Sequence, residues 1–102
     1  MNFDDPVITN PELYKILLEN EHLRIVEMIL QPGQKDDMHG HPHMGWYAEK
    51  GGKLRVNLKN GETKEMNVPD GKAMYQEPIM GHQVENIGET LVKLILFEFT
   101  PK

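Results

Sequence analysis

The chain contains no cysteine among its 102 residues. Disulfide bonds, thiolate nucleophiles and zinc sites with sulfur ligands are therefore excluded, so any metal binding or catalysis must use nitrogen and oxygen donors. Basic residues are also few: 11 lysines and arginines stand against 16 acidic residues, the formal net charge is −5, and no basic cluster is present. Because proteins that bind phosphate backbones gather cations on one face, we expect no nucleic acid partner.

Long apolar runs are absent as well. No stretch approaches the ~20 apolar residues that a helix needs to cross a bilayer. The opening residues MNFDDP have neither the basic start nor the apolar centre of a signal peptide. We therefore expect no membrane association and a cytoplasmic location.

Helix signals are scarce, whereas turn signals are frequent. Proline and glycine supply 7 and 9 residues, and the length suits one domain with a single modest core. Only residues 10–13 resemble a helix start, and the alternation that follows argues against helix beyond one turn. We predict an N-terminal arm, residues 1–12, followed by a single β domain, residues 13–100.

Runs of alternating apolar residues, separated by turns, predict the strands. Two hairpins are expected, residues 13–19 with 23–30 around Asn20 and Glu21, and residues 53–58 with 62–68 around Asn60 and Gly61. A longer extended segment covers residues 38–49, and further strands cover 73–76, 83–86 and 91–100. Strands that recur every 8 to 12 residues are typical of a sandwich or a barrel, so the chain is predicted to be all-β.

The last predicted strand is apolar on both faces. Residues 91–99 read LVKLILFEF, whereas a strand with one face in a core and the other in water needs only one apolar face. The N-terminal strands, residues 13–30, add further apolar surface. We therefore expect a second copy of the chain to cover this surface in a homodimer.

Three histidines carry the strongest chemical signal. His39 and His41 occupy positions i and i+2, so in a strand both side chains point to the same side, and His82 lies much later in the chain. Neutral imidazole is the commonest side-chain metal ligand, and three such rings could hold a divalent transition metal ion such as iron, zinc, nickel or manganese with open positions for a ligand. Alternatively, His39 and His41 are solvated at a barrel mouth and His82 serves packing.

Four other residues are predicted to lie beside this site or in a pocket next to it: His43, Tyr47, Gln76 and Glu77. His43 continues the parity of the histidine pair, so it could face inward as a fourth nitrogen ligand, but we interpret it as a residue behind the ligands or at the rim. Tyr47 and Gln76 would line a cavity suited to a small, partly apolar ligand, unless the barrel is filled by its own side chains. Asp36 and Asp37 are expected to lie in a solvated turn.

These residues resemble the two short motifs of the cupin superfamily. The first motif contains a glycine, a His-x-His pair, a glutamate and a second glycine; Gly33, His39, His41 and Gly52 match, while Gly45 stands at the glutamate position. In the second motif Gly71, His82 and Asn86 match, whereas Glu77 and Ile79 replace a proline and a glycine. The resemblance extends from about Leu13 to Phe99.

The resemblance implies the fold of the cupins, a double-stranded β-helix or jelly-roll barrel. The sequence is similar to small single-domain cupins, and without the glutamate it looks like the three-histidine cupins, some of which bind iron for oxygen chemistry. Glu49, by its parity, or Glu77, through a loop or bulge, could replace the missing glutamate ligand. Otherwise both are exposed surface carboxylates.

Two functions are consistent with this resemblance, because cupins include enzymes, sugar-binding domains and metal-free members. The first is a metal-dependent enzyme of dioxygenase or isomerase type that acts on a small oxygenated substrate, with Tyr47, Glu77 or His43 as the general base. The second is a non-catalytic barrel that binds or senses a small molecule, with or without metal. An inert barrel would have its cavity filled by Trp46, Met74 or Met80.

Overall fold

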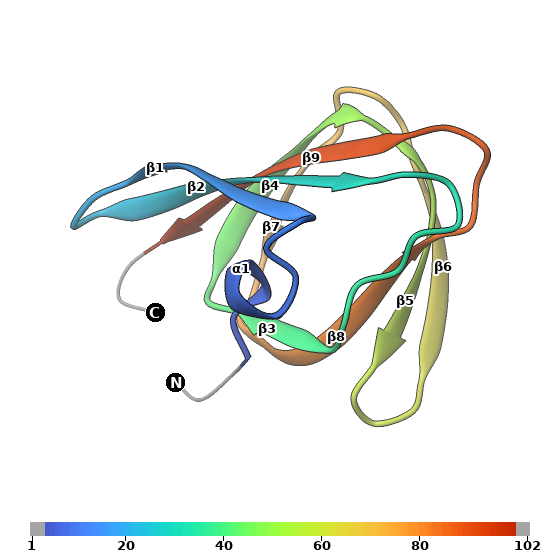
Figure 1. The fold of residues 1–102 in the computed structure, drawn as a ribbon, viewed down its shortest axis with the longest axis horizontal. Helices are drawn as coiled ribbons and strands as arrows, with labels where there is room; N and C mark the ends of the chain where they lie inside the picture. The colour runs from blue at the N-terminus through green and yellow to red at the C-terminus, as the bar shows by residue number, and fades with distance from the viewer. Residues whose placement is uncertain (1–3, 100–102) are drawn as a thin grey trace.

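A computed structural model describes residues 4–99, which fold into one short helix and nine strands (Figure 1). The elements are α1 (Pro6–Thr9), β1 (Tyr14–Glu19), β2 (Leu23–Leu30), β3 (His39–His41), β4 (Met44–Lys50), β5 (Gly52–Leu58), β6 (Thr63–Val68), β7 (Ala73–Gln76), β8 (Ile79–Asn86) and β9 (Val92–Phe99). The predicted end of the last strand at residue 100 lies outside the described residues. Within the described part, no helix is long and apolar enough to span a membrane.

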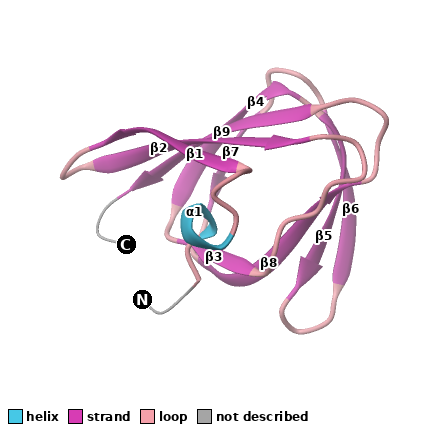
Figure 2. Cartoon of the chain, viewed as in Figure 1, coloured by secondary structure: helices cyan, strands magenta, loops and turns pink. Residues whose placement is uncertain are grey.

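The strands form two antiparallel sheets that face each other across the interior (Figures 1 and 2). One sheet has five strands in the order β1-β2-β9-β4-β7, and the other has four in the order β3-β8-β5-β6. Both predicted hairpins are present, as β1 with β2 and β5 with β6. The prediction of an all-β fold is confirmed.

The extended segment predicted over residues 38–49 is in fact two strands in different sheets. β3 pairs with β8, whereas β4 pairs with β9 and β7, and Pro42 and His43 join them. A proline lacks the N–H that a continuous ladder requires, so the chain changes sheet there. The change also shifts the parity, because the even-numbered residues of β4, such as Met44 and Trp46, are buried.

The helix lies earlier than the sequence pattern predicted. α1 ends before Asn10, which is its C-cap, so the expected helix start at residues 10–13 is wrong. Asp5 is the N-cap, and its Oδ1 accepts a hydrogen bond from the backbone N–H of Val7 at 3.0 Å. Pro6 follows at the first helical position, where its fixed φ suits a helix and its missing N–H is not needed.

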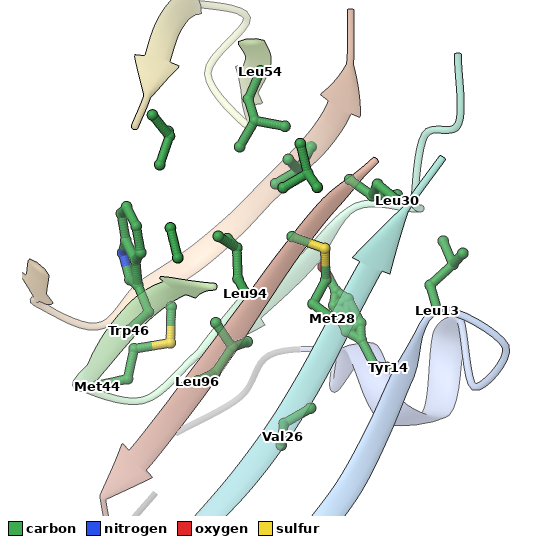
Figure 3. Packing of buried hydrophobic residues seen from close by; sticks show 14 residues of the cluster. Leu13, Tyr14, Val26, Met28, Leu30, Met44, Trp46, Leu54, Leu94 and Leu96 are labelled. Atoms are coloured by element: carbon green, nitrogen blue, oxygen red, sulfur yellow. The ribbon is translucent and has the colours of Figure 1, made fainter. Parts of the chain in front are cut away.

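The core lies between the two sheets and is built from alternate residues of each strand. β2 and β9 are neighbours, and every second residue of each is buried. Their inward apolar side chains meet those of β4 and β5 (Figure 3), and the labelled members include Val26, Met28, Leu94, Leu96, Met44, Trp46 and Leu54. One inward position of β9 breaks this apolar pattern, because it holds Glu98.

Candidate metal centre

Three histidine side chains converge on the inner face of the four-stranded sheet. His39 and His41 lie on β3, and His82 lies opposite His39 on the neighbouring strand β8. All three residues are buried, and one potential ligand nitrogen from each lies within 4.8 Å of the others. Within residues 4–99 this group of mutually close ligand atoms contains no carboxylate.

Hydrogen bonds leave ring nitrogens free to act as ligands. Nδ1 of His39 lies 2.8 Å from the carbonyl oxygen of Asp37. Because a carbonyl can only accept, Nδ1 must carry the proton and Nε2 keeps its lone pair. Nδ1 of His41 is held in the same way by Glu98 at 2.8 Å. Nε2 of His82 is buried and has no hydrogen-bond partner among the described residues.

Burial keeps two of these rings neutral. It lowers the pKa of His82 to about 2, with a further contribution from the charges of His39 and His41. It also lowers the pKa of His39 to about 4, with a smaller effect of His41 in the same direction. The neutral ring is the state in which imidazole binds a metal ion, so at neutral pH these side chains are ready to act as ligands.

A series of ion pairs, buried at Glu98 and Arg24 and half-buried at Asp5, lies behind His41, and the sequence analysis did not predict it. Glu98 is completely buried and receives hydrogen bonds from His41 and from Nε of Arg24, the latter at 2.7 Å. Arg24 in turn contacts both carboxylate oxygens of Asp5, at 2.9 and 3.0 Å. Burial alone would raise the pKa of Glu98, but the hydrogen bond and charge of His41, together with Arg24, lower it below its ordinary value. Glu98 is therefore ionised at neutral pH.

Tyr14 and Asp36 form a second polar pair beside His39. The Tyr14 hydroxyl donates to Oδ2 of Asp36 at 2.5 Å, and its oxygen lies 3.4 Å from Nε2 of His39. Asp36 is fully buried, so the expected solvated turn is wrong at this residue. Burial raises the pKa of Asp36 to about 6, and burial followed by the Asp36 charge raises the pKa of Tyr14 well above its ordinary value. The phenol therefore keeps its proton.

A cavity of about 300 Å³ opens next to the histidines. Its walls are mostly aliphatic and sulfur-containing side chains from both sheets, and its polar groups are Tyr14, His41, His82, Lys64 and Gln76. Trp46 forms part of the wall, while Met74 and Met80 are exposed and do not fill the cavity. The barrel therefore has room for a small molecule beside the histidines.

The other residues predicted to lie near the site are divided between the cavity and the surface. Gln76 lines the cavity, and its Oε1 accepts a hydrogen bond from Nε1 of Trp46 at 3.1 Å. His43 does not line it; its ring contacts Tyr75 and Phe99 instead. Tyr47 is 44% exposed, because the change of parity at Pro42 turns it outward.

Neither glutamate considered as a replacement ligand reaches the histidines. Glu49 lies on the outer face of β4 and forms an ion pair with Lys93 at 3.3 Å. Its predicted inward parity is wrong for the same reason as that of Tyr47. Glu77 is exposed and accepts a hydrogen bond from the Tyr75 hydroxyl at 3.4 Å. Two other carboxylates approach the site: Glu98 contacts Nδ1 of His41, and Oδ2 of Asp36 lies 3.4 Å from Nδ1 of His39.

Comparison with known sequences finds one informative relative. The chain is 36% identical over 73 residues to oxalate decarboxylase of Bacillus subtilis strain 168. The matched segment is 68% of this chain and only 19% of that enzyme. The chain thus spans about a fifth of that relative, and no family model matches the sequence.

Solved structures share the fold at low sequence identity. A cupin domain from Bordetella pertussis has a TM-score of 0.79 at 18% identity, over 86% of this chain and 92% of that one. An RmlC-like cupin family protein from Methanocaldococcus jannaschii, described as a double-stranded β-helix, has a TM-score of 0.69 at 17% identity, over 85% and 78%. The polyketide cyclase RemF of Streptomyces resistomycificus has a TM-score of 0.63 at 15% identity, over 84% and 63%. The chain is therefore a cupin by fold, a small double-stranded β-helix with three histidines placed where they could hold a metal ion.

Proposed function

We propose that this cupin binds one divalent transition metal ion through His39, His41 and His82 and uses it to act on a small oxygenated molecule. Three imidazole ligands suit iron, zinc or nickel and leave coordination positions open. When bound, such an ion polarises oxygen groups and orients the molecule that carries them. A dioxygenase or isomerase type of reaction is the activity that we propose.

The buried Nε2 of His82 is the observation that carries this proposal. A buried polar nitrogen without a partner is unfavourable by about 1–3 kcal/mol, so folded proteins rarely keep one without a use. Here the unpartnered atom belongs to a ring whose neighbours are two further histidines with Nδ1 already engaged. A metal ion would satisfy all three free nitrogens together.

The cavity indicates the kind of molecule that the site would accept. Most of its wall is apolar, so the body of the ligand should be apolar and small enough for about 300 Å³. The polar groups around it would orient an oxygen-containing group near the histidines, with the Gln76 amide and the Tyr14 hydroxyl as hydrogen-bonding partners. Lys64 lines the cavity on β6, where its cation would favour a ligand that carries negative charge.

A barrel that binds a small molecule without turnover is the second candidate function. It is favoured because none of the general bases considered from the sequence, Tyr47, Glu77 and His43, lines the cavity. Tyr14 does line it, but the proton of its hydroxyl is directed to Asp36. Product formation by metal-loaded protein with small apolar carbonyl or carboxylate compounds separates the two functions.

Elemental analysis of untagged protein, purified without chelator, tests the metal proposal. We expect close to one transition metal ion per chain, and a fall of at least tenfold in the variant His82→Gln, which keeps a polar side chain but loses the imidazole. The matched control is His22→Gln, because His22 is exposed and lies outside the cluster. A wild-type protein that takes up no iron, zinc, nickel or manganese after anaerobic loading would contradict the proposal.

We also propose that the chain works as a homodimer through the outer face of the five-stranded sheet. One row across this face runs Leu18, Ile25, Phe97, Gly45 and Tyr75. The ends of the row are open, since Leu18 is 47% and Tyr75 57% exposed. Gly45 leaves a gap between the aromatic side chains, and a second copy related by a two-fold axis could fill it, because such an interface is self-complementary.

Light scattering after size exclusion tests the dimer. At micromolar concentration the wild-type protein should have twice the chain mass of 11.8 kDa. The variant Phe97→Asp should have the mass of one chain, because a buried unpaired carboxylate opposes association. Thr63→Asp, an exposed substitution on β6 in the other sheet, is the control and should leave the mass unchanged. A wild-type monomer would refute the dimer.

A further inference from the structure

A line of charges, buried at Arg24 and Glu98 and half-buried at Asp5, connects the N-terminal segment to one of the three histidines. It runs from Asp5, before α1, through Arg24 on β2 and Glu98 on β9 to His41 on β3. The side chain of Arg24 is 5% exposed and that of Glu98 is fully buried. Burying a carboxylate among apolar side chains is unfavourable by several kcal/mol, so its placement behind a candidate ligand calls for a functional explanation.

Both oxygens of Glu98 are already engaged. Oε1 accepts from Nε of Arg24 at 2.7 Å and lies 2.5 Å from Nη2 of the same residue, while Oε2 lies 2.8 Å from Nδ1 of His41. This arrangement keeps the carboxylate away from the open side of the histidine cluster. It also fixes the tautomer of His41, because an ionised carboxylate can only accept and the proton must lie on Nδ1.

We propose that Glu98 is a positioning residue of the metal site, which acts on the ion through its hydrogen bond with His41. The inference rests on the proposed function. By accepting the Nδ1 proton, Glu98 holds the His41 ring with Nε2 directed at the other histidines and makes that nitrogen a better donor. It also places a negative charge beside His41, as Asp36 does beside His39, where Oδ2 of Asp36 lies 3.4 Å from Nδ1. Both carboxylates thus lie behind the histidines rather than among the candidate ligands.

Arg24 and the N-terminal segment hold this carboxylate in place. Arg24 in turn donates hydrogen bonds from its two terminal nitrogens to the two carboxylate oxygens of Asp5, at 2.9 and 3.0 Å. The backbone carbonyl of Asp4 accepts from the N–H of Gly40, between the two histidines of β3, at 2.8 Å. Figure 1 shows α1 next to β3, so the segment that carries Asp5 lies against the strand that it supports. Rigid outer partners of this kind are what a precise ligand geometry requires.

The variant Glu98→Gln tests the inference through metal affinity rather than activity. We expect its dissociation constants for Zn²⁺ and Co²⁺, measured by competition with a chromophoric chelator, to rise by about 10–100-fold. The visible absorption of the Co²⁺ complex should shift as well, because the His41 nitrogen becomes a weaker donor. Glu49→Gln removes an exposed carboxylate on the outer face and should leave both measurements unchanged.

A double variant keeps the inference testable if Glu98→Gln does not fold. Replacing an ion pair by apolar residues of similar volume is often neutral for stability, so Arg24→Met with Glu98→Leu should fold and show the same weakening. If either folded variant bound Zn²⁺ and Co²⁺ with wild-type affinity, the role of Glu98 would be refuted while the proposed function would stand. Failure of the wild-type protein to bind Zn²⁺ or Co²⁺ would instead overturn the proposed function, and the role of Glu98 with it.

Discussion

Replacing Arg24 by methionine is expected to lower the free energy of unfolding of the metal-free protein by about 3–5 kcal/mol. The substitution keeps most of the buried aliphatic volume but removes the cation that lies between Glu98 and Asp5. Glu98 has no exposed surface, so its charge would be left in the core with His41 as its remaining partner. Breaking one side of a buried ion pair is far more damaging than removing the whole pair, because an uncompensated charge remains.

Urea unfolding at pH 7, followed by the fluorescence of Trp46, measures this change. The matched control is Arg55→Met, which also removes an arginine with two carboxylate partners, Glu65 and Glu85. Because the Arg55 side chain is 38% exposed, its loss should lower the stability by less than about 1 kcal/mol. If both substitutions lowered the free energy of unfolding equally, burial would not make the ion pairs of Arg24 more important for stability than those of Arg55.

The stability of the metal-free protein is expected to fall as the pH falls from about 6 to about 4. In the unfolded chain His39 and His82 take up protons near their ordinary pKa of 6.5, whereas in the folded protein their pKa values are about 4 and about 2. Asp36 acts in the opposite direction, since its folded pKa of about 6 exceeds the ordinary value of 3.8. Between about pH 6 and 5 the unfolded state therefore binds about one proton more than the folded state, and stability falls by about 1.4 kcal/mol per pH unit. Below about pH 5 the lowered pKa of Glu98 adds to this slope.

Chemical denaturation at pH 4, 5 and 6 in the presence of chelator gives this slope. In the variant His82→Leu the unfolded state loses one of its two histidine protons, so the dependence between pH 5 and 6 should nearly vanish. The same variant should be more stable than the wild type at pH 5, because an unpartnered buried nitrogen is replaced by an apolar side chain. A flat wild-type profile, or an unchanged slope in His82→Leu, would contradict the assignment of neutral buried histidines.

Local patterns in the sequence predict much of the fold. Asn60 and Gly61 mark the turn between β5 and β6, and strict alternation marks the strands on either side of it. The i, i+2 rule correctly places the side chains of His39 and His41 on one side of β3. These features depend on residues that are close in the sequence, so they can be recognised without knowledge of the tertiary structure.

The errors arise where the outcome depends on tertiary structure. The alternation of His39 and His41, continued through Pro42, predicts that Tyr47 and Glu49 face inward. The chain changes sheet at Pro42, so both side chains face outward. The contact between Arg24 and Glu98 joins residues 74 positions apart, and its geometry depends on β2 and β9 being neighbours. One signal was present, since a charged residue at an inward position of an apolar strand predicts a buried partner.

X-ray diffraction from crystals of metal-loaded protein, collected on both sides of the absorption edge of the bound metal, tests the central claim most directly. The account predicts one anomalous peak per chain inside the barrel, about 2.0–2.2 Å from one ring nitrogen each of His39, His41 and His82. Glu98 should remain hydrogen-bonded to Nδ1 of His41 and should not contact the ion. A peak bound by other residues would contradict the claim that these histidines form a metal site. The absence of a peak in crystals of metal-loaded protein, with the three histidine side chains well ordered, would contradict it as well.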